Sequence, residues 1–226
     1  EEPDEKQREL LTATFRRDIF PVLTPLAIDQ VHPFPHLLNK SINLAVILKR
    51  PKDSERLFAV VQVPALLPRF VHQKMEGVHV LIPLETVIRM HLPELFPGME
   101  IEHSTVFRVT RNSEYEIDDD VEDLLATIEE EVRNRRRGFA VRLEIESNAS
   151  PIISKYLIQA LDLDPTDVYS SDDFLDLTGL FQIHALPGFP HLRDSQFVPQ
   201  PVTDFLAAPS VFAAIRARDI LVHHPY

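Results

Sequence analysis

The segment from residue 21 to residue 35 carries four prolines, at positions 21, 25, 33 and 35. Each proline fixes its own φ at about −65°, lacks an amide donor and disfavours a helical conformation of the preceding residue, so Thr24, His32 and Phe34 should be extended. Only five glycines occur in 226 residues, which leaves few positions for flexible loops. The sequence therefore predicts a rigid connector, and the fold must bury its apolar side chains Leu23, Leu26, Ile28 and Phe34.

The apolar spacing around this connector predicts helices and hairpins. Residues 5–19 form an amphipathic pattern typical of a helix that ends before Pro21. The β-branched runs 42–50 and 56–63 indicate two central strands of a hairpin, and 69–73 with 78–83 indicate a second hairpin, whose turn is expected to place Gly77 at positive φ. A short helix over 84–92 and a strand over 104–111 follow.

The second half alternates helices with strands. From Asp118 an apolar stripe predicts a helix whose acids precede its arginines, with Gly138 at its C′ position. Residues 139–146 alternate as a half-buried strand, and Ser150 should cap a helix that begins at Pro151. A short helix over 173–183, a proline-rich connector over 187–209, a helix over 210–218 and a terminal strand complete the pattern. Together these elements predict an α+β fold with a mixed or mainly antiparallel sheet, helices on one side and an amphipathic helical arm in front.

Composition excludes several function classes. The net charge of −12 argues against wholesale binding to nucleic acid, which needs a basic face. The chain has no cysteine, which excludes disulfides and thiolate chemistry, and it has no apolar run long enough to cross a bilayer. The glycines are never closer than nine residues, so neither a P-loop nor a dinucleotide fingerprint is present, and no Gly-x-Ser-x-Gly turn exposes a nucleophile. The absence of a starting methionine leads us to expect a segment of a longer polypeptide.

The histidines and acids favour structural roles over metal binding. His32 and His36 have helical metal-ligand spacing, but the prolines between them make the segment extended. His223 and His224 are adjacent on an expected strand and would point to opposite faces. His72 and His79 are expected to face each other across the second hairpin. The acidic run 118–120 lacks the glycine and distal glutamate of a calcium loop, and helix capping explains it.

The arginine run near residue 135 has two interpretations. It can complement a helix C-terminus beside an acidic segment, which is the commoner reason for such a run. It can also contact a polyanion. The candidate polyanion-contacting residues are Arg133, Arg135, Arg136 and Arg137, with Arg142 as a further member.

Taken together, several blocks resemble the head, or middle, part of bacterial polyphosphate kinases that synthesise long-chain polyphosphate. These blocks occur in the family's order over nearly the whole chain: "FPVLTPLAID" with "HPFP", "INLAVIL", "VPALLPRFV", "LFPGMEI", "FRVTRN", "DDVEDLLATIEEEVRNRRRGFAVRLEI" and "FAAIRARDILVHHPY". His36 departs from the pattern, since the family often has another phenylalanine there. The resemblance implies that residues 1–20 end the linker from an amino-terminal domain, 21–218 form the head, and 219–226 begin the first catalytic carboxy-terminal domain.

The resemblance also implies an activity for the parent enzyme. Enzymes of this family reversibly transfer the terminal phosphate of ATP to polyphosphate through a phosphohistidine, with Mg²⁺ shielding the phosphates. No residue here matches the phosphorylated histidine or the ligands of ATP and magnesium, so no catalytic, cofactor-binding or metal-binding residue is expected in this segment. The resemblance implies a scaffold that contributes to a homo-oligomer, in a cytoplasmic enzyme whose complex can associate with a membrane. The alternative is a polyanion-binding module that uses the Arg133–Arg137 run.

Overall fold

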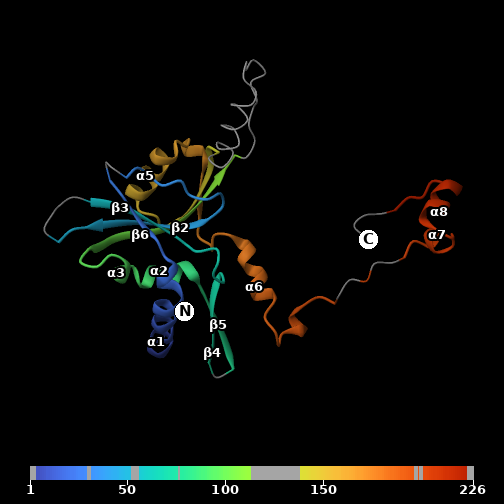
Figure 1. Cartoon of the computed structure of the whole chain (residues 1–226), viewed down its shortest axis with the longest axis horizontal. Coiled ribbons are helices and arrows are strands. Elements are labelled where there is room, and N and C mark those ends of the chain that lie inside the picture. Colours follow the sequence, from blue (N-terminus) through green and yellow to red (C-terminus); the bar gives the residue numbers. More distant parts are fainter. Residues whose placement is uncertain are drawn as a thin grey trace, which may run out of the picture. The chain divides into compact units, whose positions relative to one another are not determined.

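The computed structural model describes residues 4–29, 32–51, 56–75, 77–112, 138–195, 198 and 201–222. The chain divides into two compact units, Glu1–Ala185 and Leu186–Tyr226. No helix in the described part of the chain is long and apolar enough to cross a membrane. The first unit contains the sheets and the main helices (Figure 1).

The first unit is built on a six-stranded sheet with the order β1-β3-β2-β6-β7-β8. All neighbours are antiparallel except β7 and β8, which are parallel. A separate antiparallel pair, β4 with β5, forms the second predicted hairpin, and Gly77 in its turn has φ of 86°. The strands are β1 (Pro25–Ile28), β2 (Ile42–Lys49), β3 (Arg56–Gln62), β4 (Phe70–Met75), β5 (Val78–Pro83), β6 (Glu100–Arg111), β7 (Ala140–Glu146) and β8 (Val168–Ser171).

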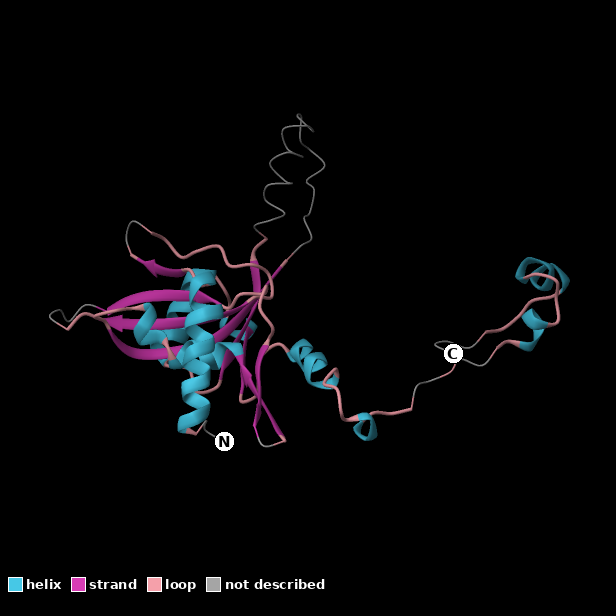
Figure 2. Ribbon diagram, turned by 60° about the horizontal axis from the view of Figure 1, so that its bottom comes forward, coloured by secondary structure: helices cyan, strands magenta, loops and turns pink. Residues whose placement is uncertain are grey.

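Helices cover both faces of the six-stranded sheet (Figures 1 and 2). Those of the first unit are α1 (Glu5–Thr14), the π-helix η1 (Phe15–Ile19), α2 (Leu84–Met90), α3 (Leu92–Leu95), α5 (Pro151–Leu161) and α6 (Leu180–His184), with short 3₁₀ turns η2 (Phe20–Val22), η3 (Pro165–Asp167) and η4 (Leu177–Gly179). The second unit contains the 3₁₀ turn η5 (Pro190–Leu192), α7 (Thr203–Leu206) and α8 (Val211–Ala217).

Strand β2 explains why both faces need a cover. Its side chains from Ile42 to Leu48 are all buried, and the apolar ones alternate between two clusters. Leu44 and Val46 pack in the cluster that contains α2, whereas Ala45 and Ile47 pack in the cluster that contains α5. A strand buried on both faces has a nearly continuous apolar sequence, as this one has apart from Asn43. The α+β class and the mixed sheet are confirmed, but α5 lies on the face opposite α2, so the helices are not confined to one side.

The amino-terminal arm is part of the first apolar cluster. A reciprocal capping box between Asp4 and Gln7 starts α1. The helical path continues as the π-helix η1 and ends in a 3₁₀ turn that contains Pro21, close to the predicted end. Leu11, Phe15 and Ile19 are buried against residues of the sheet and α2.

Several local predictions differ from the structure. Leu26 is 40% exposed because β1 is an edge strand with a single neighbour. A register shift opposite Thr110 and Arg111 interrupts the alternation at the start of β7, so Phe139 and Val141 are exposed although Leu143 and Ile145 are buried. Residues 219–222 are not a strand, and no strand of the described residues pairs with them. Ser150 precedes α5 as predicted, but its side chain makes no capping hydrogen bond.

The predicted helix over 118–137 lies outside the described residues, but Gly138 is described. A Cβ at Gly138 would lie 1.8 Å from the backbone oxygen of Asn112. The Asn112 amide also donates to the Phe139 carbonyl, so the two backbone segments are held close together at the end of the β6–β7 ladder. Close backbone approach is therefore a requirement for glycine at this position, and the predicted helix C′ role stays a prediction because the preceding residues lie outside the described part of the chain.

Replacing Gly138 with alanine is expected to lower the free energy of unfolding by about 1–3 kcal/mol, since the new methyl group must push apart two backbones. Urea denaturation of Gly138→Ala measures this loss. Gly98→Ala is not an adequate control, because Gly98 has positive φ. The control is Ala149→Gly, which removes one methyl group at a half-buried loop position instead of adding one. Equal stability of Gly138→Ala and the unchanged chain would contradict the prediction.

Candidate functional site

The sheet face that carries α2 changes from apolar to charged toward β7. On β7 the period of two places Arg142, Glu144 and Glu146 on this face and buried apolar residues on the other. On β6, Val106 belongs to the apolar cluster and Arg108, two residues on, faces Glu144 across the strands. We call the resulting group the charged layer; its members are Arg69, Glu85, Arg89, Arg108, Arg142, Glu144, Glu146 and Asp176.

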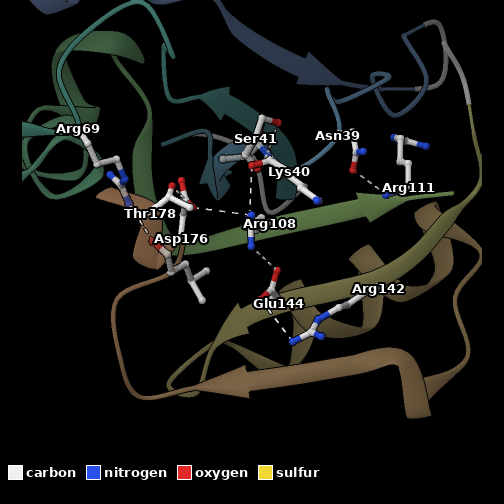
Figure 3. A network of polar contacts seen from close by, with 12 residues as sticks. Asn39, Lys40, Ser41, Arg69, Arg108, Arg111, Arg142, Glu144, Asp176 and Thr178 are labelled. Atoms are coloured by element: carbon white, nitrogen blue, oxygen red, sulfur yellow. Dashed lines mark hydrogen bonds and ion pairs between the residues drawn. The ribbon is translucent and has the colours of Figure 1, made fainter. Parts of the chain in front are cut away.

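Arg108 lies at the centre of the charged layer (Figure 3). Its Nη1 donates to Glu144 Oε2 at 3.0 Å, and its Nη2 lies 3.8 Å from Asp176 Oδ1. Its Nε donates to the backbone oxygen of Lys40 at 3.2 Å. One guanidinium thus joins β6 to β7, to the loop before β2 and to the loop after β8.

Arg69 and Glu85 form the most buried ion pair of the layer. Arg69 directly precedes β4, Glu85 lies in the first turn of α2, and their side chains are 11% and 8% exposed. Both guanidinium nitrogens Nη1 and Nη2 donate to the carboxylate, and Nη2 also donates to the backbone oxygen of Leu175 at 3.3 Å. Burial lowers the pKa of Arg69 to about 10, against the opposing effect of the Asp176 carboxylate, so the group stays charged at neutral pH.

The segment after β8 packs against the Arg69 side chain. The guanidinium carbon lies 4.6 Å from the centre of the Phe174 ring, and that ring stacks on Phe70 at 5.4 Å. A Cβ at Gly179 would lie 2.8 Å from Arg69 Cγ, so only glycine allows this approach without a shift. Arg69 therefore fixes residues 174–179 against the hairpin and α2.

A second charged connection runs from α2 to β7. Arg89 Nη2 donates to both carboxylate oxygens of Glu146, at 2.7 and 2.6 Å. The backbone amide of Val106 donates to the same carboxylate at 2.9 Å. Glu146 therefore holds α2 and β6 together, and its charge is already compensated by Arg89.

Beside the layer is an open depression of about 840 Å³, within the size range of ligand pockets. Arg142 lines it, donating to Glu144 Oε1 at 3.4 Å while its guanidinium lies 4.0 Å from the centre of the Tyr169 ring. Apolar side chains make up most of the remaining wall: Phe70, Leu81, Pro83, Phe174, Leu175, Leu177, Leu180 and Ile183. The depression is thus mainly apolar, and its arginines are engaged by carboxylates.

Some of the candidate residues predicted from the sequence lie outside the described part of the chain, and others make contacts that can be compared with the predictions. Arg133, Arg135, Arg136 and Arg137 lie outside the described residues, as do His223 and His224, so their roles stay predictions. His32 contacts Asp29, with Nδ1 and Oδ1 at 3.0 Å, and the predicted meeting of His72 and His79 across the hairpin is confirmed. Within the described ranges no cluster of three or more His, Cys, Asp or Glu side chains is present.

Sequence reasoning did not find Arg69, Glu85 or Asp176. Their contacts join segments that are 16 or more residues apart, and nothing in the local pattern distinguishes them from solvent-exposed charges. A usable signal existed for β7, where the alternation predicted that Arg142 and Glu144 share one face. The partner of that face, Arg108, required the β6–β7 register.

Residues 6–183 match the family model described as "Polyphosphate kinase middle domain". The chain therefore belongs to the polyphosphate kinase family, and the family resemblance of the sequence blocks is confirmed.

Individual relatives agree with this assignment. The chain is 44% identical over 228 residues to a polyphosphate kinase of Streptomyces coelicolor, covering 98% of this chain and 30% of that protein. It is 42% identical over 232 residues to a polyphosphate kinase of Halalkalibacterium halodurans, covering 100% and 33%. The crystal structure of polyphosphate kinase from Porphyromonas gingivalis has the same fold, with a TM-score of 0.71 and 24% identity over 100% of this chain and 32% of that one. The chain thus spans about a third of the length of these relatives.

The domain boundaries predicted from the sequence stay predictions. The family match covers 6–183, and the compact units divide after Ala185.

Proposed function

We propose that this chain is the scaffold domain of an enzyme that reversibly transfers the terminal phosphate of ATP to polyphosphate. In this proposal the phosphorylated histidine and the residues that hold ATP and Mg²⁺ belong to other parts of the polypeptide, and the domain also takes part in self-association. Membership of the polyphosphate kinase family supports the reaction class. The chain spans about a third of the length of these relatives, which is consistent with a catalytic part elsewhere in the polypeptide.

The observation that carries the scaffold role is the internal pairing of the charged layer. Phosphoryl transfer depends on cations that can be offered to the phosphate oxygens. In the layer, Arg69 is held by Glu85, Arg89 by Glu146 and Arg108 by Glu144. Each guanidinium is compensated by a carboxylate and ties two secondary-structure elements together. These pairs suit a rigid support better than a phosphate-binding surface.

The experiment is a transfer assay on the 226-residue chain with γ-labelled ATP, polyphosphate and Mg²⁺. We expect no label in polyphosphate and no acid-labile label on any of the ten histidines, because the catalytic groups lie elsewhere in this proposal. The full-length polyphosphate kinase of Streptomyces coelicolor, assayed beside it, is the positive control. Label on a histidine of this chain would contradict the proposal.

The alternative function, a polyanion-binding module that uses Arg133, Arg135, Arg136 and Arg137, makes a different prediction for the same samples. Such a module would retain polyphosphate with a steep dependence on salt, because binding releases counterions. Retention that disappears when these four arginines are changed to alanine would favour the alternative over a pure scaffold.

A further inference from the structure

Two histidines meet on one face of the β4–β5 hairpin. In the antiparallel register His79 lies opposite Lys74, and His72 is two residues before Lys74, so the two histidines are diagonal neighbours. His72 Nε2 and His79 Nδ1 are 2.9 Å apart. The His72 side chain is exposed, so the pair is accessible to solutes.

The rings are oriented so that these two nitrogens face each other. Their planes differ by 22° and their centres are 4.9 Å apart. Because the centres are farther apart than the nitrogens, both nitrogens lie between the rings. The contact is a hydrogen bond in which one ring donates and the other accepts with its lone pair.

We propose that His72 and His79 form a two-imidazole chelate for a late first-row divalent cation such as Cu²⁺, Ni²⁺ or Zn²⁺. Imidazole nitrogens bind such ions at about 2.0–2.1 Å, which places two adjacent ligands roughly 2.9–3.4 Å apart for angles between square-planar and tetrahedral. The observed separation is at the short end of that range. The ion takes the place of the shared hydrogen, off the line that joins the two nitrogens, and the donor ring then carries its hydrogen on its other nitrogen, so that both neutral rings offer a lone pair.

The surroundings define the class of ligand. Lys74 lies opposite His79 in the hairpin and contributes the neighbouring positive charge. The described residues supply no third His, Cys, Asp or Glu ligand, so water completes the coordination sphere. Hard ions such as Mg²⁺ prefer oxygen ligands and are not expected here. This site is independent of the proposed scaffold role.

The test is a titration of the 226-residue chain with Cu²⁺ at pH 7, followed by electron paramagnetic resonance and calorimetry. The unchanged chain is expected to hold one Cu²⁺ with two nitrogen ligands from this pair. His72→Ala and His79→Ala should each lose about 100-fold in affinity, because the second imidazole binds intramolecularly at high effective concentration.

Matched controls separate the pair from other histidines and from unfolding. His103→Ala removes an exposed histidine of β6 and should bind Cu²⁺ as the unchanged chain does. Lys74→Met removes the neighbouring charge, keeps both imidazoles and should bind at least as tightly. Circular dichroism without metal should be the same for all variants. Undiminished Cu²⁺ affinity in both His72→Ala and His79→Ala would overturn the proposal, as would a spectrum with one nitrogen ligand in the unchanged chain.

Discussion

Replacing Arg69 with methionine is expected to lower the free energy of unfolding by about 3–5 kcal/mol, the usual result of leaving one member of a buried ion pair without its partner. The remaining Glu85 carboxylate would be only 8% exposed. The loss of the guanidinium also removes the hydrogen bond to the Leu175 carbonyl and the contact with the Phe174 ring. Urea denaturation followed by circular dichroism measures the change.

Two further variants make this expectation specific. The double variant Arg69→Met with Glu85→Leu should recover most of the lost stability, since an apolar replacement of a buried ion pair is often neutral. Arg56→Met breaks a pair with Glu102 in which the arginine side chain is 53% exposed, and it should cost about 1 kcal/mol or less. If Arg69→Met lowered the free energy of unfolding no more than Arg56→Met does, the inference that the buried Arg69–Glu85 pair stabilises the fold would be wrong.

The same pair shows where sequence reasoning stops. Strands β2 and β3 could be predicted because an apolar, β-branched run carries its own signal, and their buried positions followed from it. Arg69 and Glu85 meet because the hairpin β4–β5 brings the end of one loop beside the start of α2. A charge has no periodic signal that reveals its partner, so this contact depends on tertiary structure.

Two predictions from local sequence patterns were wrong because tertiary structure determined the burial of Phe139 and the placement of the helices. The alternation over 139–146 predicted a buried Phe139, but the register shift between β6 and β7 leaves it 78% exposed. Hairpins followed by alternating helices and strands predicted helices on one side of the sheet, whereas α5 crosses from β7 to the parallel strand β8 and covers the other face. By contrast, the meeting of His72 and His79 was predictable, because a hairpin with a short turn fixes its register.

Replacing Phe107 with alanine is expected to lower the free energy of unfolding by about 3–5 kcal/mol, the usual range for truncating a buried phenylalanine. Phe107 lies on β6 between β2 and β7, is 0% exposed and packs in the cluster that α5 covers. Phe181→Ala on α6 is the matched control, since that ring is 75% exposed and its loss should change stability by about 0.5 kcal/mol or less. Urea denaturation of both variants measures the difference. Equal losses would mean that the α5 cluster does not hold the sheet together, and the two-sided core would then be wrong.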